Sequence, residues 1–118
     1  ARLEALRQLA ARAKDSIYEG DFASLGAIMS ANTDVQRRLH PELVCARFEE
    51  IIALAADFGT LGWKVNGAGG DGGSITLLSD GDMAKKRRML QTLAARGYQS
   101  LPLYLSRSGL RVWTCPVA

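Results

Sequence analysis

The sequence predicts an α+β domain in which helices pack on one face of a small antiparallel sheet, behind an N-terminal helical hairpin. Apolar residues recur at spacings of three and four through residues 2–59, which is typical of amphipathic helices. Two short alternating segments then flank a glycine-rich loop, and the short connection favours antiparallel pairing. Helices combined with such a sheet define the α+β class.

Length and composition favour one domain spanning residues 1–118. The chain has 47% apolar and 23% charged residues, the ordinary level for a folded domain. No apolar stretch is long enough to cross a membrane, and no basic-then-apolar leader opens the sequence. Two widely separated cysteines form neither a metal motif nor a disulfide framework. We therefore expect a cytoplasmic protein, without a membrane partner.

The first two predicted helices form the hairpin. Residues 2–19 make the first, Gly20 ends it, and Asp21 caps a second helix over residues 22–39. The inward stripe of the first helix is expected to be Leu3, Leu6, Leu9, Ala13 and Ile17. That of the second is expected to be Phe22, Leu25, Met29, Asn32, Val35 or Gln36, and Leu39.

A third helix is predicted from Pro41 to Gly59, because proline suits a first helical turn. Its expected core residues are Val44, Phe48, Ile51, Ile52, Ala55 and Phe58.

The second half of the chain predicts the sheet. Strands are expected at residues 63–66 and 74–79, followed by a helix over residues 83–96 with Met83, Leu90, Leu93 and Ala94 inward. Two more strands are expected at Tyr98–Leu105 and Leu110–Thr114. Pro102 cannot donate to a ladder, so the first of these would be an edge strand or carry a bulge.

Residues 67–73, Gly-Ala-Gly-Gly-Asp-Gly-Gly, are the most informative segment. Small residues let backbone N–H groups converge into a nest that binds anions, phosphate above all. The alternative is a flexible hairpin tip. No Gly-Lys-Ser/Thr follows, and a strand rather than a helix comes next, so neither a P-loop nor a dinucleotide fingerprint is present.

The segment from Lys64 through Gly67-Ala68-Gly69-Gly70-x-Gly72-Gly73 resembles the third motif of the GHMP small-molecule kinases, such as galactokinase, mevalonate kinase and heptose kinases. Three segments upstream are similar to the helices that precede this motif in the sugar and heptose kinases. They are Asp21-Phe22-x-x-Leu25-Gly26-x-x-Met29-x-x-Asn32, Leu39-His40-Pro41 and Gly59-x-x-Gly62-x-Lys64. Asp71 departs from the glycine that most members have there.

The resemblance implies a ferredoxin-like domain that forms the C-terminal part of an ATP- and Mg²⁺-dependent kinase acting on a sugar or another small alcohol. No Ser/Gly-rich ATP loop of the family's N-terminal domain occurs in this sequence, so that domain is expected to be a separate partner region of the same protein. The fragment is then expected to hold no catalytic residue and to be inactive alone. The resemblance implies that the phosphate or substrate cleft is lined by the whole glycine-rich loop. Its residues are Gly67, Ala68, Gly69, Gly70, Asp71, Gly72 and Gly73.

For three side chains the sequence leaves two interpretations open. Asn32 faces a substrate or hydrogen-bonds to a neighbouring loop, and Lys64 neutralises phosphate or faces water. Asp71 holds Mg²⁺ or a substrate hydroxyl, or it points into solvent.

The alternative function is a non-catalytic ferredoxin-like module that binds a metabolite or regulates a partner. A net charge of +3 permits an anionic ligand but does not indicate nucleic acid, and the basic run at residues 85–88 has no aromatic neighbour. We expect no nucleic-acid partner, and a homodimer is compatible with the sequence.

Overall fold

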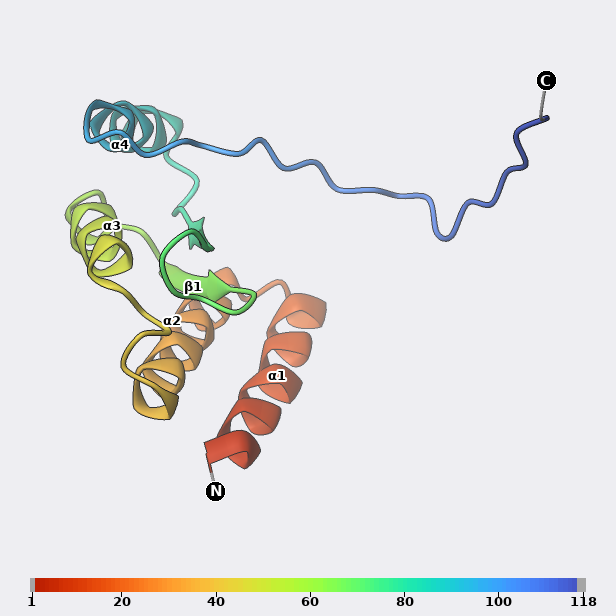
Figure 1. The fold of residues 1–118 in the computed structure, drawn as a ribbon, viewed down its shortest axis with the longest axis horizontal. Coiled ribbons are helices and arrows are strands. Elements are labelled where there is room, and N and C mark those ends of the chain that lie inside the picture. Colours follow the sequence, from red (N-terminus) through yellow and green to blue (C-terminus); the bar gives the residue numbers. More distant parts are fainter. Residues whose placement is uncertain (1, 117–118) are drawn as a thin grey trace.

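The computed structural model describes residues 2–116 and confirms the α+β class. Its elements are α1 (Arg2–Glu19), α2 (Phe22–Leu39), α3 (Ala46–Asp57), β1 (Gly62–Asn66), β2 (Ser74–Leu78) and α4 (Met83–Ala95). β1 and β2 form an antiparallel pair in which Val65 lies opposite Ile75. Figure 1 shows the α1–α2 hairpin on one side of β1 and the α3 and α4 helices on the other.

The predicted helical hairpin is confirmed, and its boundary follows from local capping. Gly20 takes a left-handed conformation with φ of +70°, which ends α1. The Asp21 side chain then accepts a hydrogen bond from the Ser24 N–H at 2.9 Å and caps α2. The hairpin is held by a small apolar cluster of Leu9, Ile28 and Val35.

The main core lies between the sheet, α3 and α4. Its buried residues are Val44, Phe48, Ile51, Ile52, Ala55, Val65, Met89 and Leu93. The predicted inward face of the third helix is therefore confirmed, except that Phe58 is only half-buried.

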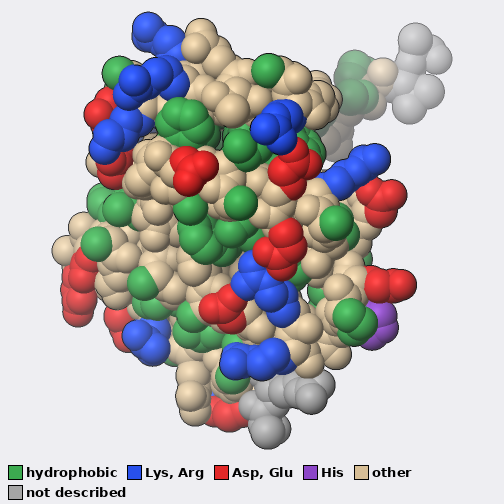
Figure 2. Space-filling model, turned by 90° about the vertical axis from the view of Figure 1, so that its left-hand side faces the viewer, with side chains coloured by type: hydrophobic (Ala, Val, Ile, Leu, Met, Phe, Trp, Pro, Cys, Tyr) green, Lys and Arg blue, Asp and Glu red, His purple; other side chains and the backbone are tan. Residues whose placement is uncertain are grey.

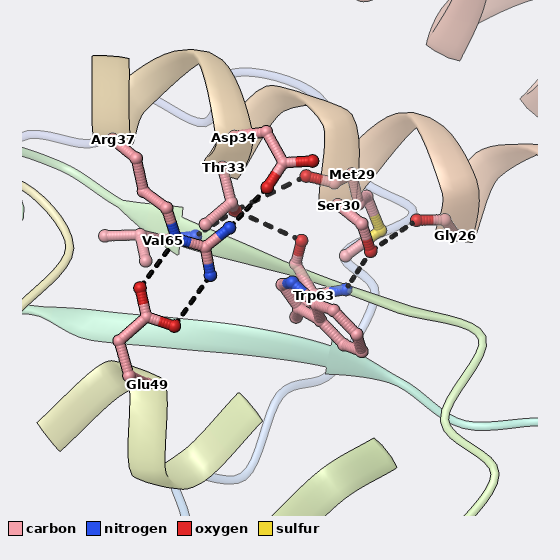
Figure 3. Close-up of polar contacts among 9 residues, drawn as sticks. All are labelled: Gly26, Met29, Ser30, Thr33, Asp34, Arg37, Glu49, Trp63 and Val65. Carbon is pink, nitrogen blue, oxygen red and sulfur yellow. Dashed lines mark hydrogen bonds and ion pairs between the residues drawn. The ribbon is translucent and has the colours of Figure 1, made fainter. Parts of the chain in front are cut away.

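Side chains of α2 replace a third strand along the outer edge of β1 (Figure 3). The Thr33 hydroxyl accepts from the Val65 N–H and donates to the Trp63 carbonyl, both at 3.3 Å. The Ser30 hydroxyl accepts from the Trp63 N–H at 3.3 Å, and the Gln36 amide donates to the Val65 carbonyl at 3.2 Å. The backbone groups of this edge are thus satisfied by a helix, as buried polar groups require.

A glycine pair allows α2 to come this close to the sheet. A Cβ on Gly26 would lie 2.4 Å from the Leu61 carbonyl oxygen, and one on Gly62 would meet the Gly26 carbonyl oxygen. Only two residues without side chains permit this backbone approach.

The prediction that the third helix begins at Pro41 is wrong, because α3 begins at Ala46 with Cys45 as its N-cap. In a helix from Pro41, the Leu43 carbonyl would accept from the residue four positions later. Here that carbonyl accepts from the Gly70 N–H of the glycine-rich loop at 3.2 Å. A tertiary contact therefore takes the acceptor that the helix would need.

The predicted strands at Tyr98–Leu105 and Leu110–Thr114 are also wrong, since residues 98–116 form no regular element. Figure 1 shows them leaving the body as an extended segment, which we call the C-terminal arm. A strand needs a neighbouring strand for its backbone groups, and among residues 2–116 no strand pairs with the arm.

Several residues predicted to face inward are exposed. They are Leu3, Ile17, Phe22, Met83 and Ala94. The first four lie at or near the ends of their helices. In α2 the buried residues are instead Gly26, Ile28, Thr33 and Val35, because this helix contacts α1 on one side and β1 on the other.

Candidate functional site

The glycine-rich loop, residues 67–73, connects β1 to β2 and is seated against the segment that precedes α3. Gly70 donates its N–H to the Leu43 carbonyl, and the Cys45 thiol lies 3.6 Å from the Gly70 carbonyl oxygen. A Cβ on Gly69 would stand only 2.3 Å from the Leu43 oxygen. The loop is therefore held in place at its centre rather than being a free hairpin tip.

Glycine is required at this loop for its backbone conformation as well as for space. Gly67, Gly69, Gly70 and Gly72 all have positive φ, from +62° to +105°. Residues with a side chain rarely adopt such values. Where a residue of negative φ precedes a glycine of positive φ, as at Ala68–Gly69 and Asp71–Gly72, successive N–H groups turn toward one side of the chain.

Some of the loop's backbone N–H groups are used internally and others are free. Gly69, Gly70 and Gly73 donate within the fold, to the carbonyls of Asn66, Leu43 and Gly70. The N–H groups of Gly67, Ala68, Asp71 and Gly72 have no acceptor among the described residues, and these four residues are exposed. The free groups are donors available to an anion.

The N-terminus of α3 adds positive potential beside the loop. Its N-cap, Cys45, makes no side-chain capping bond, and Phe48 of the first turn lies 3.1 Å from a Cβ built on Gly73. Unpaired N–H groups at a helix N-terminus carry partial positive charge and favour anions.

Arg47, also in the first turn of α3, lies 3.5 Å from Asp71 of the loop. Both side chains are more than 70% exposed, so this ion pair is worth little and leaves Arg47 accessible to a second anion. Sequence reasoning missed Arg47, because a helix starting at Pro41 would place this residue in its second turn.

Asp71 does not belong to a metal-binding cluster. Within residues 2–116, no group of three or more histidine, cysteine, aspartate or glutamate side chains is arranged to hold a metal ion.

The structure brings Asn32 and Lys64 together, but away from the loop. Both line a groove of about 530 Å³ between α1 and α2, together with apolar residues that include Leu9, Ile28 and Met29. None of the loop residues lines this groove. The Lys64 ammonium donates to the Val65 carbonyl at 3.1 Å, so it does not point freely into solvent.

Several charged side chains away from the loop form local ion pairs. Arg37 binds Glu49 through two nitrogens, at 2.6 and 2.8 Å, and also pairs with Asp34 (Figure 3). The hydrogen bond that the Arg37 guanidinium donates to Glu49 raises the pKa of Arg37 above its ordinary value. Near the centre of the face drawn in Figure 2, acidic and basic side chains lie next to one another.

Within the described residues, no helix is both long and apolar enough to cross a membrane.

The glycine-rich loop, the N-terminus of α3 and Arg47 thus lie next to one another on this domain. A family model described as GHMP kinases C terminal matches residues 10–95, well over half of the chain and including the whole loop. The chain belongs to this family, the C-terminal domain of GHMP kinases, as the loop motif predicted. No curated protein and no solved structure matches the chain.

Proposed function

We propose that this chain is the C-terminal domain of an ATP-dependent kinase that phosphorylates a sugar or another small alcohol, and that residues 67–73 line the phosphate-bearing cleft. The observation that carries the proposal is the seated loop with four free N–H groups beside the uncapped N-terminus of α3. Family membership supports the reaction class, and the loop geometry supports the place where the phosphate binds.

Phosphoryl transfer requires positioning and stabilisation of negative charge more than covalent chemistry. The fixed N–H groups of Ala68, Asp71 and Gly72 would donate to phosphate oxygens without reorganising, because the Gly70–Leu43 contact already holds the loop. Arg47 would add a mobile positive charge at the rim of the same element. ATP would supply the transferred group, and the family's ATP loop and catalytic side chains would come from a second domain.

A pair of matched glycine variants tests the loop. Gly72 and Gly81 both have positive φ, +105° and +90°, and a Cβ on either meets nothing within 4 Å. Gly72→Ala distorts the loop, whereas Gly81→Ala introduces similar strain in the turn before α4. Titration calorimetry with pyrophosphate should show affinity at least about fivefold weaker for Gly72→Ala only. Equal affinities in both variants and the wild type would place the anion elsewhere.

The need for a second domain is tested separately. The 118-residue chain, incubated with ATP, Mg²⁺ and a panel of sugars, should form ADP only at the background rate. Turnover well above background would contradict the assignment of the ATP loop and catalytic groups to another domain.

A further inference from the structure

The two edges of the sheet differ in whether their backbone groups have hydrogen-bond partners. The outer edge of β1 is sealed by Ser30, Thr33 and Gln36 of α2. Because the N–H groups of Trp63 and Val65 point toward α2, their partners Leu77 and Ile75 point their own N–H and C=O groups away from β1. No hydrogen bond to these outward groups occurs within residues 2–116.

β2 also lacks the devices that usually protect an edge. Its sequence, Ser-Ile-Thr-Leu-Leu, has no charge and no proline. Native sheets usually block an edge strand with lysine, proline, a bulge or a covering element, because an open edge recruits other strands.

The C-terminal arm has the complementary properties. Seven large apolar side chains are 63–97% exposed along it: Leu101, Leu103, Tyr104, Leu105, Leu110, Val112 and Trp113. Exposed apolar surface of this extent marks an interaction site. The arm starts from a fixed point, since Tyr98 donates to Glu50 of α3 at 2.6 Å, and then runs away from the body (Figure 1).

We propose that the outer edge of β2 accepts an extended strand, and that its occupant is the C-terminal arm of a second copy of this chain. Each copy carries one open edge and one unpartnered arm, so an exchange between two copies satisfies both in a closed two-fold dimer. Residues 98–106 of the arm carry no charge, like β2, so pairing avoids like-charge repulsion in spite of the net charge of +3.

Pro102 fixes the side of the arm that faces β2. Proline lacks an N–H, so it fits only where that group would point to solvent. Residues 101, 103 and 105 then direct their N–H groups toward the outward groups of Ile75 and Leu77. This mode is strand addition, in which backbone hydrogen bonds supply affinity.

Two proline variants in the arm test this register. Leu103→Pro removes an N–H that faces β2, whereas Tyr104→Pro removes one that faces solvent. Neither residue contributes to the folded body, where both are more than 80% exposed, so neither change should unfold it. Light scattering should give about twice the 12.7 kDa chain mass for the wild type and Tyr104→Pro, and the single-chain mass for Leu103→Pro.

Amide exchange measured by NMR identifies the occupied edge. The Ile75 and Leu77 N–H groups should exchange at least about tenfold more slowly in the dimer than in a chain ending at Ser100. A monomer with protected amides would show that the arm folds back on its own sheet, and would overturn the proposed exchange of arms between two copies. A monomer with unprotected amides, or a dimer that survives truncation, would overturn it as well.

Discussion

Replacing Gly69 with alanine tests whether the glycine-rich loop is seated on the segment before α3. Gly69 has φ of +68°, and an added Cβ would lie 2.3 Å from the Leu43 carbonyl oxygen. The left-handed conformation costs alanine about 1–2 kcal/mol. Forcing the two backbones apart costs about 1–3 kcal/mol more.

Gly67→Ala is the matched control, because Gly67 has φ of +62° and a Cβ there meets nothing within 4 Å. It should cost only the conformational part, about 1–2 kcal/mol. The free energy of unfolding, measured by urea titration, should therefore fall by roughly 1–3 kcal/mol more for Gly69→Ala than for Gly67→Ala. Equal losses in the two variants would refute the seating of the loop on Leu43.

Three further changes probe the edge of β1, the rim of the loop and the anchor of the arm. Thr33→Val leaves the Val65 N–H without its partner and should lower the free energy of unfolding by about 1–3 kcal/mol in a urea titration. Arg47→Gln should weaken pyrophosphate binding about fivefold by calorimetry, since one unit charge near the anion is worth about 1 kcal/mol. Tyr98→Phe should raise the pKa of the Glu50 carboxyl toward its ordinary value in an NMR titration, because the Tyr98 hydrogen bond is the largest cause of its lowering.

Each of these changes has a control and a contradicting result. Thr92→Val removes a hydroxyl that bonds only within α4, and a loss as large as that of Thr33→Val would mean that the contact with β1 adds nothing. Arg87→Gln removes an equal charge from α4 and should leave anion binding unchanged. Arg96→Gln should raise the pKa of Glu50 less than Tyr98→Phe does, and the reverse order would contradict the stated cause.

The pH dependence linked to Glu50 has a definite sign. Its pKa is lowered in the folded state, first by Tyr98 and then by Arg96. The stabilisation is therefore present above the unfolded-state pKa and is lost as pH falls through the folded-state value. The Arg96 and Tyr98 contacts to α3 should accordingly weaken in acid.

Features encoded by local sequence were predictable. Gly20 and Asp21 mark the turn of the hairpin, because one adopts positive φ and the other caps a helix. The strand, glycine loop and strand at residues 62–78 followed from alternation and from glycine density. The loop motif also predicted the kinase family.

Features that depend on tertiary partners were not predictable in the same way. The start of α3 moved to Ala46 because the Leu43 carbonyl bonds to a loop residue distant in sequence. The pattern of residues 98–114 is typical of strands, but a pattern cannot supply the neighbour that a strand needs. The spacing of Ser30, Thr33 and Gln36 at three-residue intervals was the available sign that one face of α2 is polar and meets the sheet.

The same limit applies to the candidate site. Residues 67–73 were identified from composition alone, whereas Arg47 entered the site only through the true start of α3. Asn32 and Lys64 were both singled out, and the structure places them in a groove that the loop does not line.

Mapping backbone amides by ¹⁵N NMR during titration with inorganic phosphate tests the central claim most directly. The account predicts that the N–H signals of Ala68, Asp71 and Gly72 shift in a saturable manner, together with those at the start of α3. Saturable shifts confined to the α1–α2 groove, or no saturable shift in residues 67–73, would contradict it.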